Sequence, residues 1–345
     1  MKKRRTSFKI SCSIGIILCL ILSGCGKTIN TQKTSVKTTS PTTTTSTSNT
    51  LMTTTTSGSK NLAGKIVFAS SDASGDFEIY VVNADGTNLK KLTNNSVGAQ
   101  YPVWSPDGRK IAFAATKDGG IYTMNADGTN LTRIVFKTKY DEYTEKDYVC
   151  ENTAPSWSPD GSMICYESYG DEDSGTTVPN ANIYVVNSDG TNIRRVTSGL
   201  TYEGQPAWSP DGSKIAFVYI KNEDNGFSNN HIYVMNSDGS NWVQLTDSKI
   251  TINNLNPAWS PDGTKIIFSG DGTEKQGIFC IKLKDKSQTY VGIGSDPQWS
   301  PDGTNIIVNR WSEGRSKIYV MNADGSNVSV INVPIDAREP VWISQ

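Results

Sequence analysis

The sequence predicts an all-β fold, a six-bladed β-propeller with four antiparallel strands per blade. Three observations predict it: two phrases recur along the chain, their spacing is regular, and no helical periodicity competes with them. The Trp-to-Trp steps of the first phrase are 53, 51, 51, 40 and 43 residues. A period of this length is typical of stacked supersecondary units. The first phrase is P-x-W-S-P-D-G-x-x-I, with its tryptophan at Trp104, Trp157, Trp208, Trp259 and Trp299, and a truncated copy at Trp342.

The second phrase supplies another strand and another tight turn in each repeat. It reads I-Y-x-x-N-x-D-G-[T/S]-N, and a worn copy at Ile278–Ile281 keeps only the apolar part. Its β-branched and aromatic residues favour strands, whereas Asn, Asp and Gly favour turns. The well-kept copies begin at Ile79, Ile121, Ile183, Ile232 and Ile318.

The repeat around Trp208 shows how one blade is built. A first strand ends at Trp208, and Ser209–Gly212 forms a tight turn, because proline presets φ and glycine accepts the positive φ that follows. Both faces of the strands carry apolar residues, as expected for small sheets packed between neighbours. The remaining strands are predicted at Lys214–Val218, Ile232–Met235 and Val243–Thr246.

The two ends of the repeat region predict that the ring is closed. Lys65–Phe68 matches a second strand, whereas Val341–Ser344 matches a first strand. The C-terminal strand therefore completes the first blade and leaves no open sheet edge. Trp342 is accordingly predicted to be a core residue.

The S-P-D-G and N-x-D-G repeats resemble the TolB-type propeller repeat, which also occurs in propellers attached to serine peptidases. The resemblance covers roughly Lys65–Ser344. It implies the propeller fold and, for the TolB family, binding of protein partners in the cell envelope. The sequence is expected to depart from that family in two ways: no N-terminal α/β domain is expected ahead of the propeller, and the chain carries its own predicted lipid anchor. A Tol–Pal-type role is therefore not implied.

Residues 1–24 are predicted to be a lipoprotein signal peptide. Lys2–Arg5 is positive, and Ile14–Leu22 is apolar but too short to span a membrane. Leu22–Cys25 resembles the lipobox of bacterial lipoproteins, which implies cleavage before Cys25 and lipid modification of Cys25. The alternative is an ordinary secretory signal with a chance cysteine. The expected location is the extracytoplasmic side of the cell membrane.

Residues 25–60 are predicted to be the lipidated cysteine and a flexible linker, followed by the propeller at 61–345. Thr fills 12 of the 19 positions in Thr38–Thr56, and no apolar periodicity could order the segment. Residues 61–345 contain 24 basic and 34 acidic residues, a formal net charge of −10. This charge argues against nucleic acid and against direct docking on anionic lipid. The expected partner is an envelope or extracellular protein or a glycan, with a monomeric chain.

Recognition is predicted on the face of the propeller opposite the repeated turns. The longer connections gather there and differ between blades, and variable loops on a rigid scaffold usually carry binding. The residue before each Pro-x-Trp phrase also differs, with Ala154 as the apolar member. Such a set could bind a polar ligand or hold a cation through oxygen atoms, although no cofactor is expected. A solvated acidic rim is the alternative. The candidate ligand-binding residues are Tyr101, Tyr143, Tyr148, Glu203, Gln205, Asn256, Asp296, Trp311, Arg338 and Glu339.

Other conspicuous residues are assigned to structure. The S-P-D-G aspartates should bond local backbone amides in their turns. Cys280 is expected in the core, whereas Cys150 and Cys165 flank the Trp157 hairpin and leave a disulfide open. The S-P-D-G aspartates are Asp107, Asp160, Asp211, Asp262 and Asp302.

The sequence favours a non-catalytic binding module over an enzyme. The single histidine, His231, stands at a strand entry, where a hydrogen-bonded or surface residue is commoner than a base. No G-x-S-x-G elbow and no zinc ligand set occur. The alternative is a polysaccharide-active enzyme, a carboxylate-pair glycosidase or a cation-assisted lyase, that uses acids of the loop-bearing face.

Overall fold

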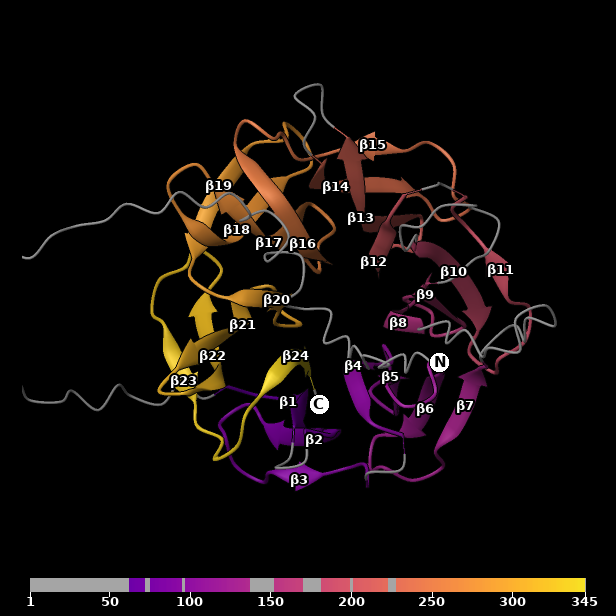
Figure 1. The fold of residues 1–345 in the computed structure, drawn as a ribbon. Helices are drawn as coiled ribbons and strands as arrows, with labels where there is room; N and C mark the ends of the chain where they lie inside the picture. Colours follow the sequence, from indigo (N-terminus) through magenta and orange to yellow (C-terminus); the bar gives the residue numbers. More distant parts are fainter. Residues whose placement is uncertain are drawn as a thin grey trace, which may run out of the picture. The chain divides into compact units, whose positions relative to one another are not determined.

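The computed structural model describes residues 62–71, 75–94, 97–136, 152–169, 181–198, 201–222 and 228–344. Cys25, Tyr143, Tyr148 and Cys150 lie outside these residues, as do the predicted signal peptide and linker. The described residues form six four-stranded antiparallel sheets arranged in a ring (Figure 1). The predicted fold class is therefore confirmed. No helix capable of crossing a membrane occurs within the described ranges.

The strands of each blade follow one another from the centre of the ring outwards. The innermost strands are β4 (Ala99–Trp104), β8 (Asn152–Trp157), β12 (Glu203–Trp208), β16 (Thr251–Trp259), β20 (Ser295–Trp299) and β24 (Arg338–Ile343) (Figure 1). The second strands are β1 (Lys65–Ser71), β5 (Lys110–Ala115), β9 (Met163–Tyr169), β13 (Lys214–Asn222), β17 (Lys265–Gly272) and β21 (Asn305–Ser312). The third strands are β2 (Phe77–Asn83), β6 (Ile121–Asn125), β10 (Ala181–Asn187), β14 (Ser228–Asn236), β18 (Gln276–Lys282) and β22 (Arg315–Asn322). The fourth strands are β3 (Lys90–Lys91), β7 (Thr132–Val135), β11 (Arg194–Arg195), β15 (Val243–Gln244), β19 (Gln288–Gly292) and β23 (Ser329–Ile331).

Blade 1 combines both ends of the described chain, in the sheet order β24-β1-β2-β3. Ile66 pairs with Trp342, whose Nε1 donates to the Ala63 carbonyl at 2.9 Å. Trp342 is only 8% exposed. The predicted closure and the core position of Trp342 are confirmed. Blades 2 to 6 each use four consecutive strands, β4–β7, β8–β11, β12–β15, β16–β19 and β20–β23.

The hydrophobic core lies between neighbouring blades. One cluster joins Val67 and Ile79 of blade 1 to Trp104 and Phe113 of blade 2. Burying one such large apolar side chain contributes roughly 1.5–3 kcal/mol to folding. The inter-blade packing therefore holds the ring together. The same second-strand position carries a fully buried phenylalanine in four blades, at Phe68, Phe113, Phe217 and Phe268.

The fourth strand of blade 4 is shorter than predicted. It ends at Gln244, because the Thr246 hydroxyl accepts the Ile232 amide at 3.0 Å and replaces a backbone acceptor there. Thr93 and Thr197 play the same part for Ile79 and Ile183. The threonine after each of these strands thus caps the third strand.

The repeated tight turns lie together on one end of the propeller, here called the turn face. In the first S-P-D-G turn the Ser105 hydroxyl donates to Asp107 Oδ1 at 2.7 Å, and the Arg109 amide donates to the same oxygen at 3.0 Å. Gly108 has φ 70°, the left-handed region that favours glycine. Because these carboxylates are occupied by their own turns, the structural role predicted for the S-P-D-G aspartates is confirmed. The opposite end, with the second-to-third and blade-to-blade connections, is called the loop face.

Candidate functional site

Six innermost-strand residues surround the centre of the ring near the loop face, one from each blade. Each precedes the proline of the Pro-x-Trp phrase, and each has a left-handed φ between 48° and 53°. Strand pairing is irregular beside them, which identifies β-bulges. A bulge turns the backbone locally and re-aims a side chain. We call these residues the axial ring; they are Tyr101, Ala154, Gln205, Asn256, Asp296 and Glu339.

Side chains of one blade accept the axial-ring amides of the next blade. The Tyr101 amide donates to Glu339 Oε2 at 2.5 Å, and the Asn256 amide donates to Gln205 Oε1 at 2.7 Å. Buried amides need such partners, because an unpaired one costs about 1–3 kcal/mol. Glu339 and Gln205 therefore have a structural duty besides any contact with a ligand.

Two further ring amides are accepted by second-strand side chains, which sequence reasoning missed. The Gln205 amide donates to Glu167 Oε2 at 2.8 Å, and the Asp296 amide donates to Ser269 Oγ at 3.2 Å. Glu167 and Ser269 occupy the same position in their blades, three residues after Ile164 and Ile266. The repeat contained a signal for these two residues. The same position is Ala or Val in blades 1, 2 and 4, so a polar residue there departs from the pattern.

Asp296 and Glu339 form an acidic half of the axial ring, at blades 6 and 1. Asp296 Oδ1 accepts a hydrogen bond from the side-chain amide of Asn256, and Asp296 Oδ2 accepts one from Asn309 Nδ2 at 2.8 Å. Burial raises the pKa of Asp296 above its usual value despite these bonds. Burial, together with the charge of Asp296, raises the pKa of Glu339 to about 8. The pair thus binds a proton more readily than ordinary carboxylates do.

No described basic side chain forms an ion pair with these two acids, although the charge of Arg338 lowers the pKa of both. Arg338 precedes Glu339 in sequence, but its Nε donates to Asp336 Oδ2 at 2.9 Å. Its guanidinium lies 5.5 Å from the centre of the Phe77 ring. None of the ion pairs within the described ranges includes Asp296 or Glu339.

A buried carboxylate also lies between blades 3 and 4. Glu167 is 1% exposed, and the Tyr202 hydroxyl donates to its Oε2 at 3.1 Å. The Tyr169 and Tyr202 rings are 6.0 Å apart. Burial raises the pKa of Glu167. Its Oε1 is buried without a hydrogen-bond partner.

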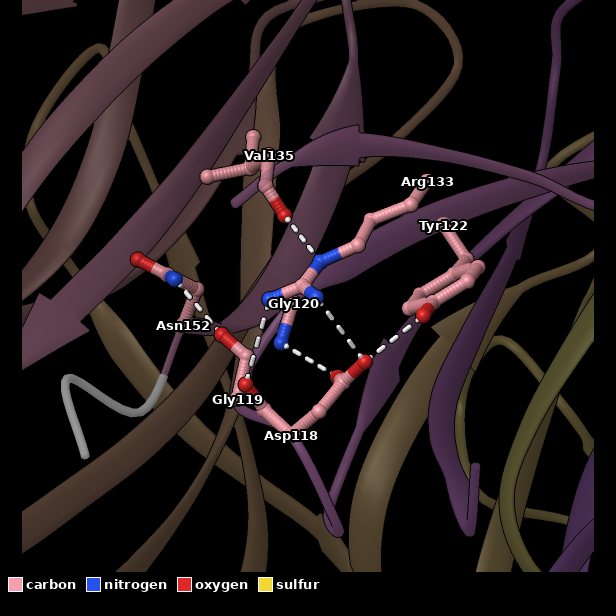
Figure 2. A network of polar contacts seen from close by, with 7 residues as sticks. All are labelled: Asp118, Gly119, Gly120, Tyr122, Arg133, Val135 and Asn152. Carbon is pink, nitrogen blue, oxygen red and sulfur yellow. Dashed lines mark hydrogen bonds and ion pairs between the residues drawn. The ribbon is translucent and has the colours of Figure 1, made fainter. Parts of the chain in front are cut away.

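Figure 2 shows a polar network that joins blades 2 and 3 near the loop face. The Tyr122 hydroxyl donates to Asp118 Oδ2 at 2.6 Å, and Arg133 Nη1 lies 3.2 Å from the same oxygen. Burial and the Asp118 carboxylate raise the pKa of Tyr122 to about 12. Asn152 Nδ2 donates to the Gly119 carbonyl at 2.6 Å and ties the next blade to this turn. The network holds two blades in place, and its polar groups are used for that purpose.

His231 also belongs to a network of polar contacts, in blade 4. It is fully buried, and its Nδ1 lies 3.3 Å from Thr246 Oγ1 and 3.2 Å from Gln244 Nε2. The sequence expectation of a hydrogen-bonded residue is confirmed. A histidine without solvent access cannot serve a substrate as a general base.

Two of the other candidate residues are placed differently from the prediction. Glu203 is fully buried and accepts the Thr201 hydroxyl at 3.2 Å, so it is not displayed at the surface. Trp311 lies in β21, paired with Ser316, rather than in a loop. The hairpin turns at Glu313 and Gly314, which both have positive φ, the conformation of a two-residue turn.

Trp311 is nevertheless the most exposed large apolar residue within the described ranges, at 70%. Ile293, before the first strand of the same blade, is 65% exposed. Arg310 Nε donates to the Ile293 carbonyl at 2.8 Å and joins the two segments. Trp311 and Ile293 form what we call the apolar rim.

Among the described residues, neither the cysteines nor any cluster of metal-ligating side chains forms another candidate site. Cys165 and Cys280 are buried free thiols, and burial raises the pKa of both. Cys280 is thus in the core, as predicted. No group of three or more His, Cys, Asp or Glu residues that could hold a metal ion occurs among the described residues.

Comparisons with known proteins agree with this geometry. The family described as "TolB beta propeller domain" matches residues 61–149, 144–252 and 248–344. A TolB homolog of Chlorobium luteolum is 30% identical over 160 residues, which are 46% of this chain and 32% of that protein. A Tol-Pal system protein TolB of Desulfosudis oleivorans is 30% identical over 135 residues, 39% of this chain and 26% of that protein. The chain thus matches about a third or less of these relatives' length.

Among solved structures, TolB from Acinetobacter baumannii superposes with a TM-score of 0.66 and 20% identity. The match covers 83% of this chain and 68% of that one. At this level of identity the likeness supports the fold alone.

Proposed function

From the premise that this chain belongs to the TolB β-propeller domain family, we propose that it is a surface-anchored lipoprotein that binds a protein or glycan through its loop face. The propeller acts as a binding module and catalyses no reaction. Both relatives described above carry the name TolB, one of them as a Tol-Pal system protein. An envelope protein is accordingly the first partner to test.

The anchor rests on the sequence around Cys25. A positive segment, a short apolar segment and Leu22–Cys25 have the order of a lipoprotein signal. Labelling cells with an alkyne-bearing fatty acid should mark the wild-type chain and not Cys25→Ser. Equal labelling of the two chains excludes Cys25 as the lipid site.

The binding surface rests above all on the acidic half of the axial ring. Asp296 and Glu339 are held by the fold without an ion pair among the described residues. Asp296 follows the exposed Ile293 by three residues, and its partner Asn309 precedes the exposed Trp311 by two. Carboxylates that form no ion pair and lie near exposed apolar side chains are suited to contact another molecule. Tyr101, Gln205 and Asn256 complete the same ring.

Capture from solubilised envelopes tests the surface. We expect Trp311→Ala to reduce recovery of a specific partner at least about tenfold, as for a central interface tryptophan. Val330→Ala is the matched control, because Val330 is 47% exposed on the outer strand of the same blade. Equal loss in both variants, or loss in neither, contradicts binding at the apolar rim.

The adjacent carboxylates also favour a second candidate, a polysaccharide-active enzyme. A carboxyl with a pKa near 8 remains protonated at neutral pH and could act as an acid, as Glu339 would beside Asp296. Release of reducing ends from a polysaccharide panel, abolished in Asp296→Asn and Glu339→Gln, would establish this candidate. Binding on a glycan array without release supports the non-catalytic proposal.

A further inference from the structure

The acidic half of the axial ring is made mainly of hydrogen-bond acceptors. Asp296 and Glu339 bring two carboxylates together, and Asn309 stands against Asp296 with its Nδ2 donating to Oδ2. Asn309 is only 4% exposed, and its Oδ1 is buried without a hydrogen-bond partner. An unpaired buried acceptor costs about 1–3 kcal/mol unless a donor reaches it. The position therefore calls for a donor.

The two carboxylates favour a hydrogen-bond donor that carries a positive charge. Arg338, the nearest basic residue in sequence, is engaged by Asp336 and lies against Phe77. Removing two carboxylates from water is costly without a counter-charge. The charge of Asp296 already opposes ionisation of Glu339. A cation placed between them would relieve both effects.

We propose that Asp296, Glu339 and Asn309 receive a cationic nitrogen group, a lysine ammonium or an arginine guanidinium, from a basic segment of a protein partner. This inference rests on the binding function proposed above. An ammonium offers three donors and a guanidinium five, and neither accepts hydrogen bonds, which matches a site of acceptors. The rest of the partner segment packs on the apolar rim of Trp311 and Ile293.

A protein segment fits better than a sugar because of the surroundings. Residues 61–345 carry a net charge of −10, which attracts a basic partner over long range. The apolar rim suits the aliphatic stem of lysine or arginine and an adjoining hydrophobic residue. Hydrogen bonds from the Asn256 side-chain amide and the Tyr101 backbone amide hold the two carboxylates in position before a partner binds.

Proton release should accompany binding. The groups that face Glu339 are Asp296 from β20, Arg338 from its own strand and the Tyr101 amide from β4. Glu339 holds a proton below about pH 8, and a bound cation favours its ionised form. Affinity for the cation should therefore rise with pH, by at most about tenfold per unit for one proton released.

The test uses the full chain in detergent and four probes: tetralysine, tetraarginine, tetracitrulline and a tetramer of glucosamine. Titration calorimetry at pH 6.5, 7.5 and 8.5 should show binding of tetralysine or tetraarginine that strengthens with pH, and none of the uncharged tetracitrulline. Asp296→Asn and Glu339→Gln should each weaken binding at least about tenfold, the usual range for one lost charged partner. Asp160→Asn, an acid of the turn face, should leave it unchanged.

Several results would overturn the inference. The inference is wrong if the wild type, Asp296→Asn and Glu339→Gln bind tetralysine and tetraarginine with equal affinity. It is also wrong if the glucosamine tetramer binds more tightly than these peptides and its binding depends on Asp296. Thermal melting of each variant checks that it is folded, and Asn309→Ala provides a second variant outside the carboxylates. If these variants bind normally while Trp311→Ala still loses its envelope partner, the binding function stands and the cation site is wrong. If the cation site holds and the partner is retained by Trp311→Ala, the apolar rim is wrong.

Discussion

The same fold shifts the pKa values of two sets of acids in opposite directions, those of the turn-face aspartates downwards and those of the axial-ring carboxylates upwards. In the turns, hydrogen bonds from a serine hydroxyl and a backbone amide lower the pKa of Asp107 and Asp160. At the axis, burial raises the pKa of Asp296 and Glu339. The turns use their acids locally, whereas the acids of the axial ring form no ion pair among the described residues.

The two regions also differ in what the repeat keeps constant. Each S-P-D-G turn closes its own hydrogen bonds, so one turn resembles the next. The axial ring has the same backbone conformation in all six blades, with φ between 48° and 53°, but different side chains. Constant backbone with variable side chains is the arrangement of a binding surface on a rigid scaffold.

Opening the ring should produce the largest effect and remove both regions at once. Trp342→Ala deletes a buried indole and its bond to Ala63, so we expect a loss of about 3–5 kcal/mol in unfolding free energy. Urea denaturation followed by fluorescence measures it. Trp311→Ala is the matched control, because that indole is 70% exposed and should cost little stability. A loss below about 1 kcal/mol in Trp342→Ala would contradict the role of β24 in closure.

Removing one acid from each region should separate structure from recognition. Asp211→Ala leaves the Ser209 hydroxyl and the Ser213 amide without their acceptor, and it should cost roughly 1 kcal/mol. Asp296→Asn keeps the shape but leaves Asn256 or Asn309 without its acceptor oxygen. Because it also relieves repulsion at Glu339, it should cost less. Chemical denaturation of both variants gives the comparison. A larger loss for Asp296→Asn would mean that the axial acids serve stability first.

The third expected difference is a pH dependence of stability with opposite signs in the two regions. Glu339 binds a proton more tightly in the folded chain than its ordinary pKa of 4.5, so its contribution to stability declines as pH rises from about 4.5 to about 8. Asp262 has a lowered pKa of about 2, so its contribution is present above about pH 3.8 and is lost as pH falls towards 2.

Melting temperatures across pH 3 to 9 test this contrast. Between pH 5 and 8, Glu339→Gln should flatten part of the decline seen in the wild type. Below pH 4, Asp262→Asn should lose less stability than the wild type. Curves that differ from the wild type by a constant offset would show that neither carboxyl titrates as described.

Repetition let the sequence predict the six blades, the closing strand and the structural role of the turn aspartates. It also located the axial-ring positions, because each directly precedes the proline of the phrase. It could not predict that these residues adopt left-handed φ, since the bulge depends on pairing between strands. The partners of Asp296 and Gln205 come from other strands, Asn309 and Glu167, which only the assembled ring brings close. Trp311 was named as a candidate ligand-binding residue, and the structure shows that it is 70% exposed and lies in β21.

Site-specific photo-crosslinking tests most directly the claim that recognition occurs at the loop face. A photoreactive amino acid replaces either Trp311 on the loop face or Arg109 on the turn face, whose side chain is 86% exposed. After irradiation of intact cells, we predict a discrete adduct from position 311 that disappears in Asp296→Asn, and none from position 109. An adduct from position 109 with none from position 311 would contradict the account.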